Sequence, residues 1–160
     1  TLQIIIKGLA ARVLRRALGL NPYFSMLIGL FITIMVQSSS ITTSTLTPLA
    51  AVGLIKLEEM FPLTLGANVG TTITGIMAAS VVTSNPQAAW QVALCHLFFN
   101  LFGIAIWYPL PLMRAVPLRA SRALGRCTAK YGVWFPIVYT LIAFFAIPGI
   151  CYGIAVAATK

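Results

Sequence analysis

The sequence predicts an all-α integral membrane protein, and three observations carry that prediction. Of the 160 residues, 59% are hydrophobic and only 8% are charged, and the mean hydropathy is +0.95. Soluble domains carry charge on about a quarter of their residues. Apart from His96, no charged or ionisable basic side chain interrupts residues 17–55, 60–113 or 131–159. Such runs can cross a hydrocarbon core, which takes about 20 helical residues, so we expect the chain to contact the lipid bilayer.

Basic residues stand beside these runs and account for the net charge of +9. The two clusters are Lys7, Arg12, Arg15 and Arg16, and Arg114, Arg119, Arg122, Arg126 and Lys130. Basic clusters next to apolar runs usually face the cytoplasm and anionic headgroups. The high positive charge therefore indicates membrane topology, and we expect no nucleic-acid partner.

Acidic residues are limited to Glu58 and Glu59, which are adjacent. This excludes catalysis by a pair of separated carboxylates and an acidic metal cage. A serine nucleophile needs a base and usually an orienting acid, and no G-x-S-x-G motif is present. We expect the protein not to be an enzyme and to hold no cofactor.

The first segments predict one interfacial helix and one hairpin. Residues 1–20 read as the end of a membrane helix that runs into a basic interfacial helix. Asn21-Pro22 then ends that helix and begins another. Residues 21–57 contain two short apolar runs on either side of a polar, uncharged stretch, QSSSITTSTLT. Each run is too short to cross a core of about 30 Å, so the pattern predicts a re-entrant helical hairpin with the QSSS motif at its tip.

The remaining segments predict crossings separated by a basic helix. Residues 60–83 have the length of one crossing, but glycines at 66, 70 and 75 lie among Asn and Thr, which predicts a broken transmembrane helix. Residues 88–113 predict a plain transmembrane helix. Residues 114–131 place their basic side chains on one stripe and predict an interfacial helix, and residues 133–159 predict the last crossing.

The hairpin tip and the broken helix offer complementary binding chemistry. A helix that begins in mid-membrane has unpaired N–H groups and a positive dipole end, which attract an anion. Hydroxyl donors surround that point, namely Ser38, Ser39, Ser40, Thr42 and Thr43. The broken helix offers neutral oxygens to a small cation from Asn68, Thr71 and Thr74 and from carbonyls near Gly66 and Gly70. This combination is typical of ion-coupled secondary transporters.

Two further polar residues stand in apolar surroundings. Gln37 both donates and accepts hydrogen bonds, which suits a residue that ties the tip to a ligand or to the second half-helix. His96 precedes Asn100 by one helical turn. We interpret His96 as a neutral packing histidine, because no carboxylate partner lies near it in the sequence.

These motifs resemble the second repeat of the type II sodium-dependent phosphate cotransporters. The resemblance rests on VQSSS at residues 36–40, TSTLTPLAAVG at residues 43–53 and PLTLGANVGTT at residues 62–72. Downstream, QVALCHLFFN at residues 91–100, WYPLPLMR at residues 107–114 and AKYG at residues 129–132 fit the same half. Two departures are an alanine, Ala67, where many members have serine, and the presence of a single QSSS motif.

The resemblance implies an inverted-repeat transporter half that carries sodium and inorganic phosphate across the plasma membrane by alternating access. It implies a phosphate site at Gln37, Ser38, Ser39 and Ser40, to which we add Thr42 and Thr43 from the residues themselves. The expected sodium residues are Gln37, Ser38, Asn68, Thr71 and Thr74, and Gly66, Gly70 and Thr72 are expected to line the site. The missing first repeat, or a second copy, would complete it, so we expect the chain to be part of a longer one.

Alternatives remain open on two points. The protein can transport another small anion with the same architecture, or it can be a non-transporting membrane assembly subunit. The membrane orientation is also open: the basic segments all lie on one side, which the charge rule assigns to the cytoplasm. The family's second hairpin is thought to enter from the extracellular side, which would place those segments outside.

Overall fold

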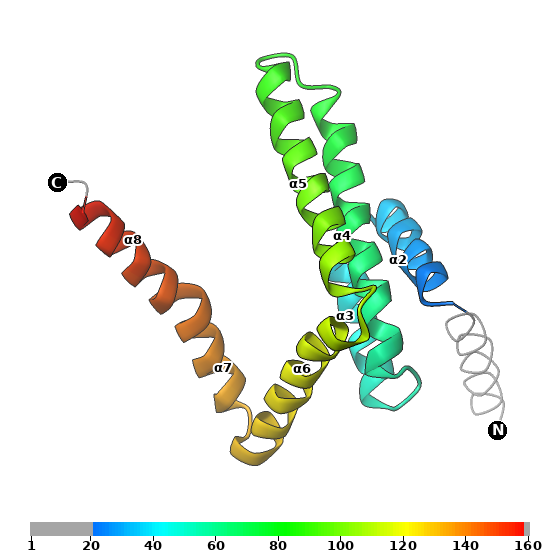
Figure 1. Ribbon diagram of the computed structural model, residues 1–160, viewed down its shortest axis with the longest axis vertical. Coiled ribbons are helices and arrows are strands. Elements are labelled where there is room, and N and C mark those ends of the chain that lie inside the picture. The colour runs from blue at the N-terminus through cyan, green and yellow to red at the C-terminus, as the bar shows by residue number, and fades with distance from the viewer. Residues whose placement is uncertain (1–20, 159–160) are drawn as a thin grey trace. The chain divides into compact units, whose positions relative to one another are not determined.

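The computed structural model describes residues 21–158, and this part of the chain is helical throughout, with short turns between the helices (Figure 1). The elements are α2 Pro22–Val36, α3 Ser39–Ala51, α4 Leu57–Ala79, α5 Pro86–Trp107, α6 Pro111–Tyr131, α7 Trp134–Leu141, the π-helix η1 Ile142–Ala146 and α8 Ile147–Ala158. The all-α prediction is confirmed for these residues. The prediction for residues 1–20 lies outside them. The chain forms two compact units, Thr1–Arg114 and Ala115–Lys160, which are described separately.

The core of the first unit is the crossing of α2 and α4, which glycines make unusually close. A methyl group added at Gly66 would overlap the carbonyl oxygen of Met26, and one added at Gly29 would overlap that of Leu63. A methyl group at Gly70 would lie 2.7 Å from the Leu30 carbonyl oxygen. Small residues let helix backbones approach closely, and here both helices contribute glycines to the contact, Gly29 from α2 and Gly66 from α4.

Residues 21–57 form two helices joined by a tight turn, where the sequence predicts the hairpin. α2 begins at Pro22 as expected, with the Asn21 side chain accepting a hydrogen bond of 2.9 Å from the Tyr23 N–H. α2 ends at Gln37, and α3 begins directly afterwards at Ser39. The Thr33 hydroxyl donates to the Thr42 hydroxyl at 3.2 Å, which joins the two helices in a buried position. Insertion of this helix pair into a membrane stays a prediction.

The predicted break in residues 60–83 is not present, because α4 runs without interruption from Leu57 to Ala79. Two physical reasons account for the correction. Gly66 and Gly70 pack against α2 and do not mark a gap in the helix. The threonine hydroxyls that could cap a new helix instead bond backward to carbonyls of the same helix, as Thr72 does to Val69 at 2.7 Å. This bonding is compatible with a continuous helix.

Two helical stretches are long and apolar enough to cross a membrane, Pro86–Trp107 and Trp134–Ala158. They correspond to the predicted crossings at residues 88–113 and 133–159, although the first ends at Trp107 and α6 already begins at Pro111. Among the described helices, α2 is apolar but shorter. α4 does not meet this criterion of length and composition, since its polar residues dilute the apolar ones.

Tyr108 closes one end of the first unit just after α5. Its ring lies 5.7 Å from the Tyr23 ring and 5.9 Å from the Phe61 ring, between centroids. The Arg114 guanidinium lies 5.3 Å from the Tyr108 ring centroid, a cation–π distance. Burial raises the pKa of the Tyr108 phenol above its usual value. The cluster therefore connects α2, α4 and the end of α5.

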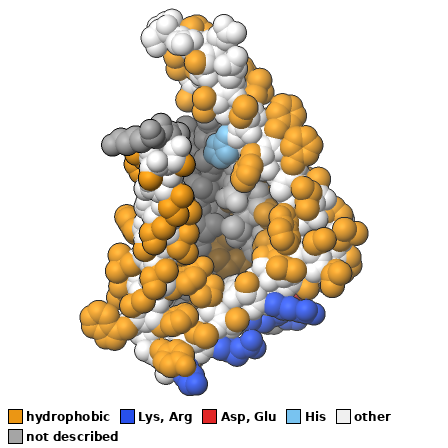
Figure 2. All heavy atoms as spheres, turned by 60° about the vertical axis from the view of Figure 1, so that its left-hand side comes forward, with side chains coloured by type: hydrophobic (Ala, Val, Ile, Leu, Met, Phe, Trp, Pro, Cys, Tyr) orange, Lys and Arg blue, Asp and Glu red, His pale blue; other side chains and the backbone are white. Residues whose placement is uncertain are grey.

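The second unit contains the rest of α6 and one long helix that changes its winding once. The π-turn at Ile142–Ala146 lies between α7 and α8, immediately before Ile147 and Pro148. Proline has no N–H for the carbonyl four residues earlier and its ring crowds that carbonyl, so the wider turn accommodates Pro148. Figure 2 shows Lys and Arg side chains gathered along one line of the molecule's surface, and hydrophobic side chains over much of the rest of the visible face. From Arg119 to Lys130 the Lys and Arg residues of α6 recur at spacings of three and four, as one helical stripe requires.

Candidate functional site

The tip between α2 and α3 presents the beginning of a helix. Gln37 ends α2 in the left-handed conformation, at φ 56°, and this turns the chain sharply. Ser38 then caps α3, with its hydroxyl accepting from the Ile41 N–H at 3.3 Å. The first N–H groups of α3 have no partner within the helix and carry the positive end of its dipole. The backbone here is suited to an anion.

The hydroxyl groups at this tip fall into two classes. Thr42 donates its hydroxyl proton to the Ser38 carbonyl at 3.0 Å, and Thr43 donates to the Ser39 carbonyl at 2.9 Å. The hydroxyls of Ser39 and Ser40 donate to no other residue in the described part of the chain. Thr42 and Thr43 therefore offer lone pairs, whereas Ser39 and Ser40 retain a proton to donate.

A cavity of about 320 Å³ lies beside Ser39 and collects polar side chains from three helices. Its lining residues are Ser39 of α3, Asn68 and Thr71 of α4, and His96 and Asn100 of α5. None of the five is Asp, Glu, Lys or Arg, so a ligand here meets hydroxyl, amide and imidazole groups. The cavity brings one predicted phosphate residue together with two predicted sodium residues.

The α4 side of this cavity supplies oxygen lone pairs. The hydroxyl of Thr71, which lines the cavity, donates to the Ala67 carbonyl at 3.2 Å. The hydroxyl of Thr74, about one turn further along α4 and outside the lining, donates to the Thr71 carbonyl at 2.8 Å. Because their protons are committed, these oxygens can only accept a hydrogen bond or coordinate a cation. Asn68 lies on the exposed side of α4 and adds an amide oxygen. The chemistry of these groups suits a small hard cation.

Other predicted site residues lie elsewhere in the first unit. Gly66 and Gly70 are in the α2–α4 crossing, and Thr72 is buried with its hydroxyl bonded to Val69. Gln37, Ser38, Ser40, Thr42 and Thr43 stand at the tip, and Thr74 lies one turn along α4, but none of these lines the cavity. Their contact with a ligand stays a prediction.

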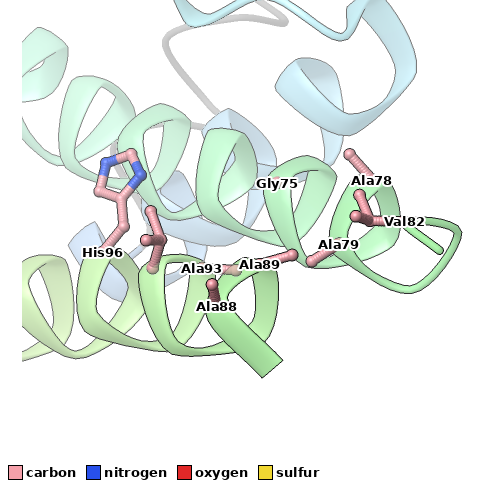
Figure 3. Close-up of a pocket in the computed structure, with 9 residues that line it drawn as sticks. Gly75, Ala78, Ala79, Val82, Ala88, Ala89, Ala93 and His96 are labelled. Carbon is pink, nitrogen blue, oxygen red and sulfur yellow. The ribbon is translucent and has the colours of Figure 1, made fainter. Parts of the chain in front are cut away.

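His96 and Asn100 are cavity residues that the sequence did not assign to the site. His96 is exposed on α5 within this chain, and its interpretation as a packing histidine stays a prediction. It also lines a second, mainly apolar cavity of about 460 Å³ between the end of α4 and the start of α5. Figure 3 shows His96 at one end of the small residues that line this second cavity. The sequence signal that could have identified these two residues is their spacing of four, which places His96 and Asn100 on one face of an otherwise apolar helix.

The family model described as Na+/Pi-cotransporter matches residues 1–136 of the chain. The chain belongs to this family. Among curated members, sodium-dependent phosphate transport protein 2A of Oryctolagus cuniculus is 42% identical over 166 residues, which cover 98% of this chain and 26% of that protein. Protein 2A of Mus musculus is 48% identical over 136 residues, covering 84% of this chain and 21% of its own length. Protein 2B of Homo sapiens is 42% identical over 163 residues, which cover 96% of this chain and 23% of that protein.

The matched region spans about a quarter of the length of these Na+/Pi-cotransporter relatives. Their names describe sodium-dependent phosphate transport by whole proteins several times longer than the match. The predicted resemblance to this family is confirmed by the family model and by these identities. No solved structure matches the chain significantly.

Proposed function

We propose that the protein to which this chain contributes carries out sodium-coupled symport of inorganic phosphate, and that the chain forms one repeat of that transporter. The observation that carries the proposal is the cavity where Ser39, Asn68 and Thr71 meet. It combines the start of α3 with the oxygen of Thr71, whose hydroxyl proton is already hydrogen-bonded, and the chain belongs to the Na+/Pi-cotransporter family. Anion and cation chemistry therefore lie within one small volume.

Phosphate binds at the start of α3 in this proposal. The N–H groups of the first turn, the Ser39 and Ser40 hydroxyls and the Gln37 amide donate to its oxygens, and the helix dipole offsets part of its charge. Thr42 and Thr43 have already donated their protons, so they contribute lone pairs near the site and not hydrogen bonds to phosphate. No lysine or arginine lies at the tip, which leaves room for a cation to balance the anion.

Sodium binds beside phosphate, with Asn68, Thr71 and Thr74 of α4 supplying oxygens and Gln37 and Ser38 supplying oxygens from the tip. Gly66 and Gly70 support this site by letting α4 pack closely against α2, and the buried Thr72 bonds within α4. A sodium ion reduces the repulsion between phosphate and the surrounding carbonyl oxygens, and this accounts for coupling. No further cofactor is needed.

The chain spans the plasma membrane several times in this proposal. α2 and α3, of 15 and 13 residues, form a re-entrant hairpin, because each is shorter than the roughly 20 residues that a full crossing takes. α6 lies at the interface with its basic stripe toward headgroups. The opposing first repeat, or a second copy, completes the phosphate site, and alternating access moves the two halves around it.

The test is uptake of radioactive phosphate by the full-length protein in vesicles. We expect uptake to require an inward sodium gradient and to collapse in Ser39→Ala and Gln37→Ala at normal membrane abundance. Ser44→Ala is the matched control, since Ser44 is an exposed α3 serine away from the cavity. Sodium-independent uptake would contradict the proposal, and stronger competition by sulfate or a carboxylate than by phosphate would assign another anion.

A further inference from the structure

We propose that Asn100 of α5 is a phosphate-binding residue that donates a hydrogen bond to the anion from its side-chain amide. This inference rests on the proposed function and extends its site to a third helix. The site predicted from the QSSS motif and α4 contains no residue of α5. The structure adds α5 because Asn100 lines the same cavity as Ser39, Asn68 and Thr71.

The first observation is the state of the Asn100 side chain. Its Nδ2 atom is buried and has no hydrogen-bond partner in the described part of the chain. A buried polar group without a partner costs about 1–3 kcal/mol. Buried amide donors are paired in most proteins, and this unpaired Nδ2 belongs to a side chain that lines a polar cavity, so we infer that a ligand supplies its acceptor.

The second observation is which groups the cavity already offers. Thr71 contributes only lone pairs, because its proton is bonded to Ala67. Of the two hydroxyl groups that line the cavity, only that of Ser39 has a proton that is not already donated in a hydrogen bond within the described part of the chain. Asn100 thus adds a donor from α5 to the cavity that Ser39 of α3 also lines.

A cation at Asn100 is less consistent with the same observation. Sodium coordinates the amide oxygen and would leave Nδ2 buried and unpaired. A phosphate oxygen satisfies Nδ2 directly, and a hydrogen bond to a charged acceptor is stronger than one between neutral groups. The unpaired donor therefore assigns Asn100 to the anion, with the α4 oxygens left for sodium.

The test measures phosphate and sodium KM separately in the full-length protein, in vesicles with known amounts of correctly inserted protein. The variants are Asn100→Ala, Asn100→Ser, which keeps one donor, and Asn100→Asp, which keeps the shape but removes the donor and adds negative charge. Gln91→Ala is the matched control, because Gln91 is an exposed amide on the same helix that does not line the cavity.

We expect Asn100→Ala to raise the phosphate KM by roughly tenfold to a hundredfold, the effect of losing a hydrogen bond to a charged group. Asn100→Ser should raise it less, Asn100→Asp should abolish saturable uptake, and Gln91→Ala should leave it within about twofold. The sodium KM should change less than the phosphate KM in Asn100→Ala.

Three results would overturn the inference. They are a phosphate KM in Asn100→Ala like that of the unaltered protein, a rise confined to the sodium KM, or a loss of inserted protein in all three variants, which would indicate a packing role. In the first two cases sodium-driven uptake by the unaltered protein would leave the proposed function standing. If the unaltered protein shows no such uptake, the proposed function itself fails and the inference fails with it.

Discussion

The α2–α4 crossing and the cavity between α3, α4 and α5 are built from the same kinds of residue and do different things. In the crossing, glycines remove all space between the helices, and Ser25, Thr33 and Thr72 are almost fully buried. In the cavity, Ser39, Asn68 and Asn100 surround open volume, and protons remain available on Ser39 and Asn100. The crossing has no place for a ligand.

This comparison shows that a high density of serine and threonine does not by itself locate a binding site. What distinguishes the cavity is that two of its donors, those of Ser39 and Asn100, are not bonded within the described part of the chain. Thr72 and Thr42 donate to carbonyls one turn earlier in their own helices, and this bonding also occurs in purely structural helices. Available donors that converge on one cavity are the more specific signal.

The largest effect on stability is expected from a substitution that prevents α2 and α4 from packing closely. Gly66→Ala places a methyl group against the Met26 carbonyl, a backbone atom that cannot rotate away. We expect destabilisation near the upper end of the roughly 1–3 kcal/mol typical of overpacking. The measurement is the melting temperature and monodispersity of the full-length protein in detergent.

Gly75→Ala is the control for that experiment. Gly75 lies on the same helix as Gly66, but a methyl group added there would meet no neighbouring atom within 4 Å. Replacing this helical glycine should be neutral or stabilise by about 0.5–1 kcal/mol. Equal losses in the two variants would show that helix α4 tolerates no alanine at either position, and the close crossing would not be the reason.

The next effect tests the two classes of hydroxyl at the α3 tip. Ser39→Ala removes an available donor and should raise the phosphate KM by roughly tenfold to a hundredfold, so that uptake at low phosphate collapses, since hydrogen bonds to charged groups contribute about 1.5–3 kcal/mol. Thr43→Val removes a hydroxyl whose proton is already bonded to the Ser39 carbonyl, so we expect a smaller rise. Initial rates of phosphate uptake at saturating sodium give both values. A larger effect from Thr43→Val would reverse the assignment.

The smallest effect concerns the hydroxyl contact between α2 and α3. The Thr33 and Thr42 hydroxyls lie 3.2 Å apart and are buried. A double-mutant cycle with Thr33→Val and Thr42→Val should give a coupling energy of roughly 0.6 kcal/mol, the average for such bonds between membrane helices. Thermal unfolding of the four proteins provides the measurement. Strict additivity would mean that this contact does not hold the hairpin together.

Much of the fold was accessible from the sequence. The start of α2 at Pro22, the turn at Gln37 and Ser38, and the two long apolar helices follow from proline, length and hydrophobic content. The continuity of α4 did not follow, because Gly66 and Gly70 have the same local signature in a broken helix as in a close helix crossing. Their partner, α2, lies some 40 residues earlier in the chain, beyond the reach of local patterns.

Only part of the candidate site could be predicted from the sequence, because the rest depends on tertiary packing. Ser39, Asn68 and Thr71 stood out because polar residues cluster around them in the sequence. Asn100 and His96 are isolated in an apolar helix, where single polar residues usually make packing contacts. Their approach to the cavity depends on how α5 packs against α4, and that tertiary contact is absent from the sequence pattern.

Equilibrium binding of radioactive phosphate to the purified full-length protein tests the central claim most directly. The account predicts saturable binding in sodium, much weaker binding in choline at equal ionic strength, and loss of the sodium-dependent part in the double variant Ser39→Ala/Asn100→Ala. The double variant Ser44→Ala/Gln91→Ala should bind like the unaltered protein. Undiminished sodium-dependent binding by Ser39→Ala/Asn100→Ala would contradict the claim that this cavity holds phosphate.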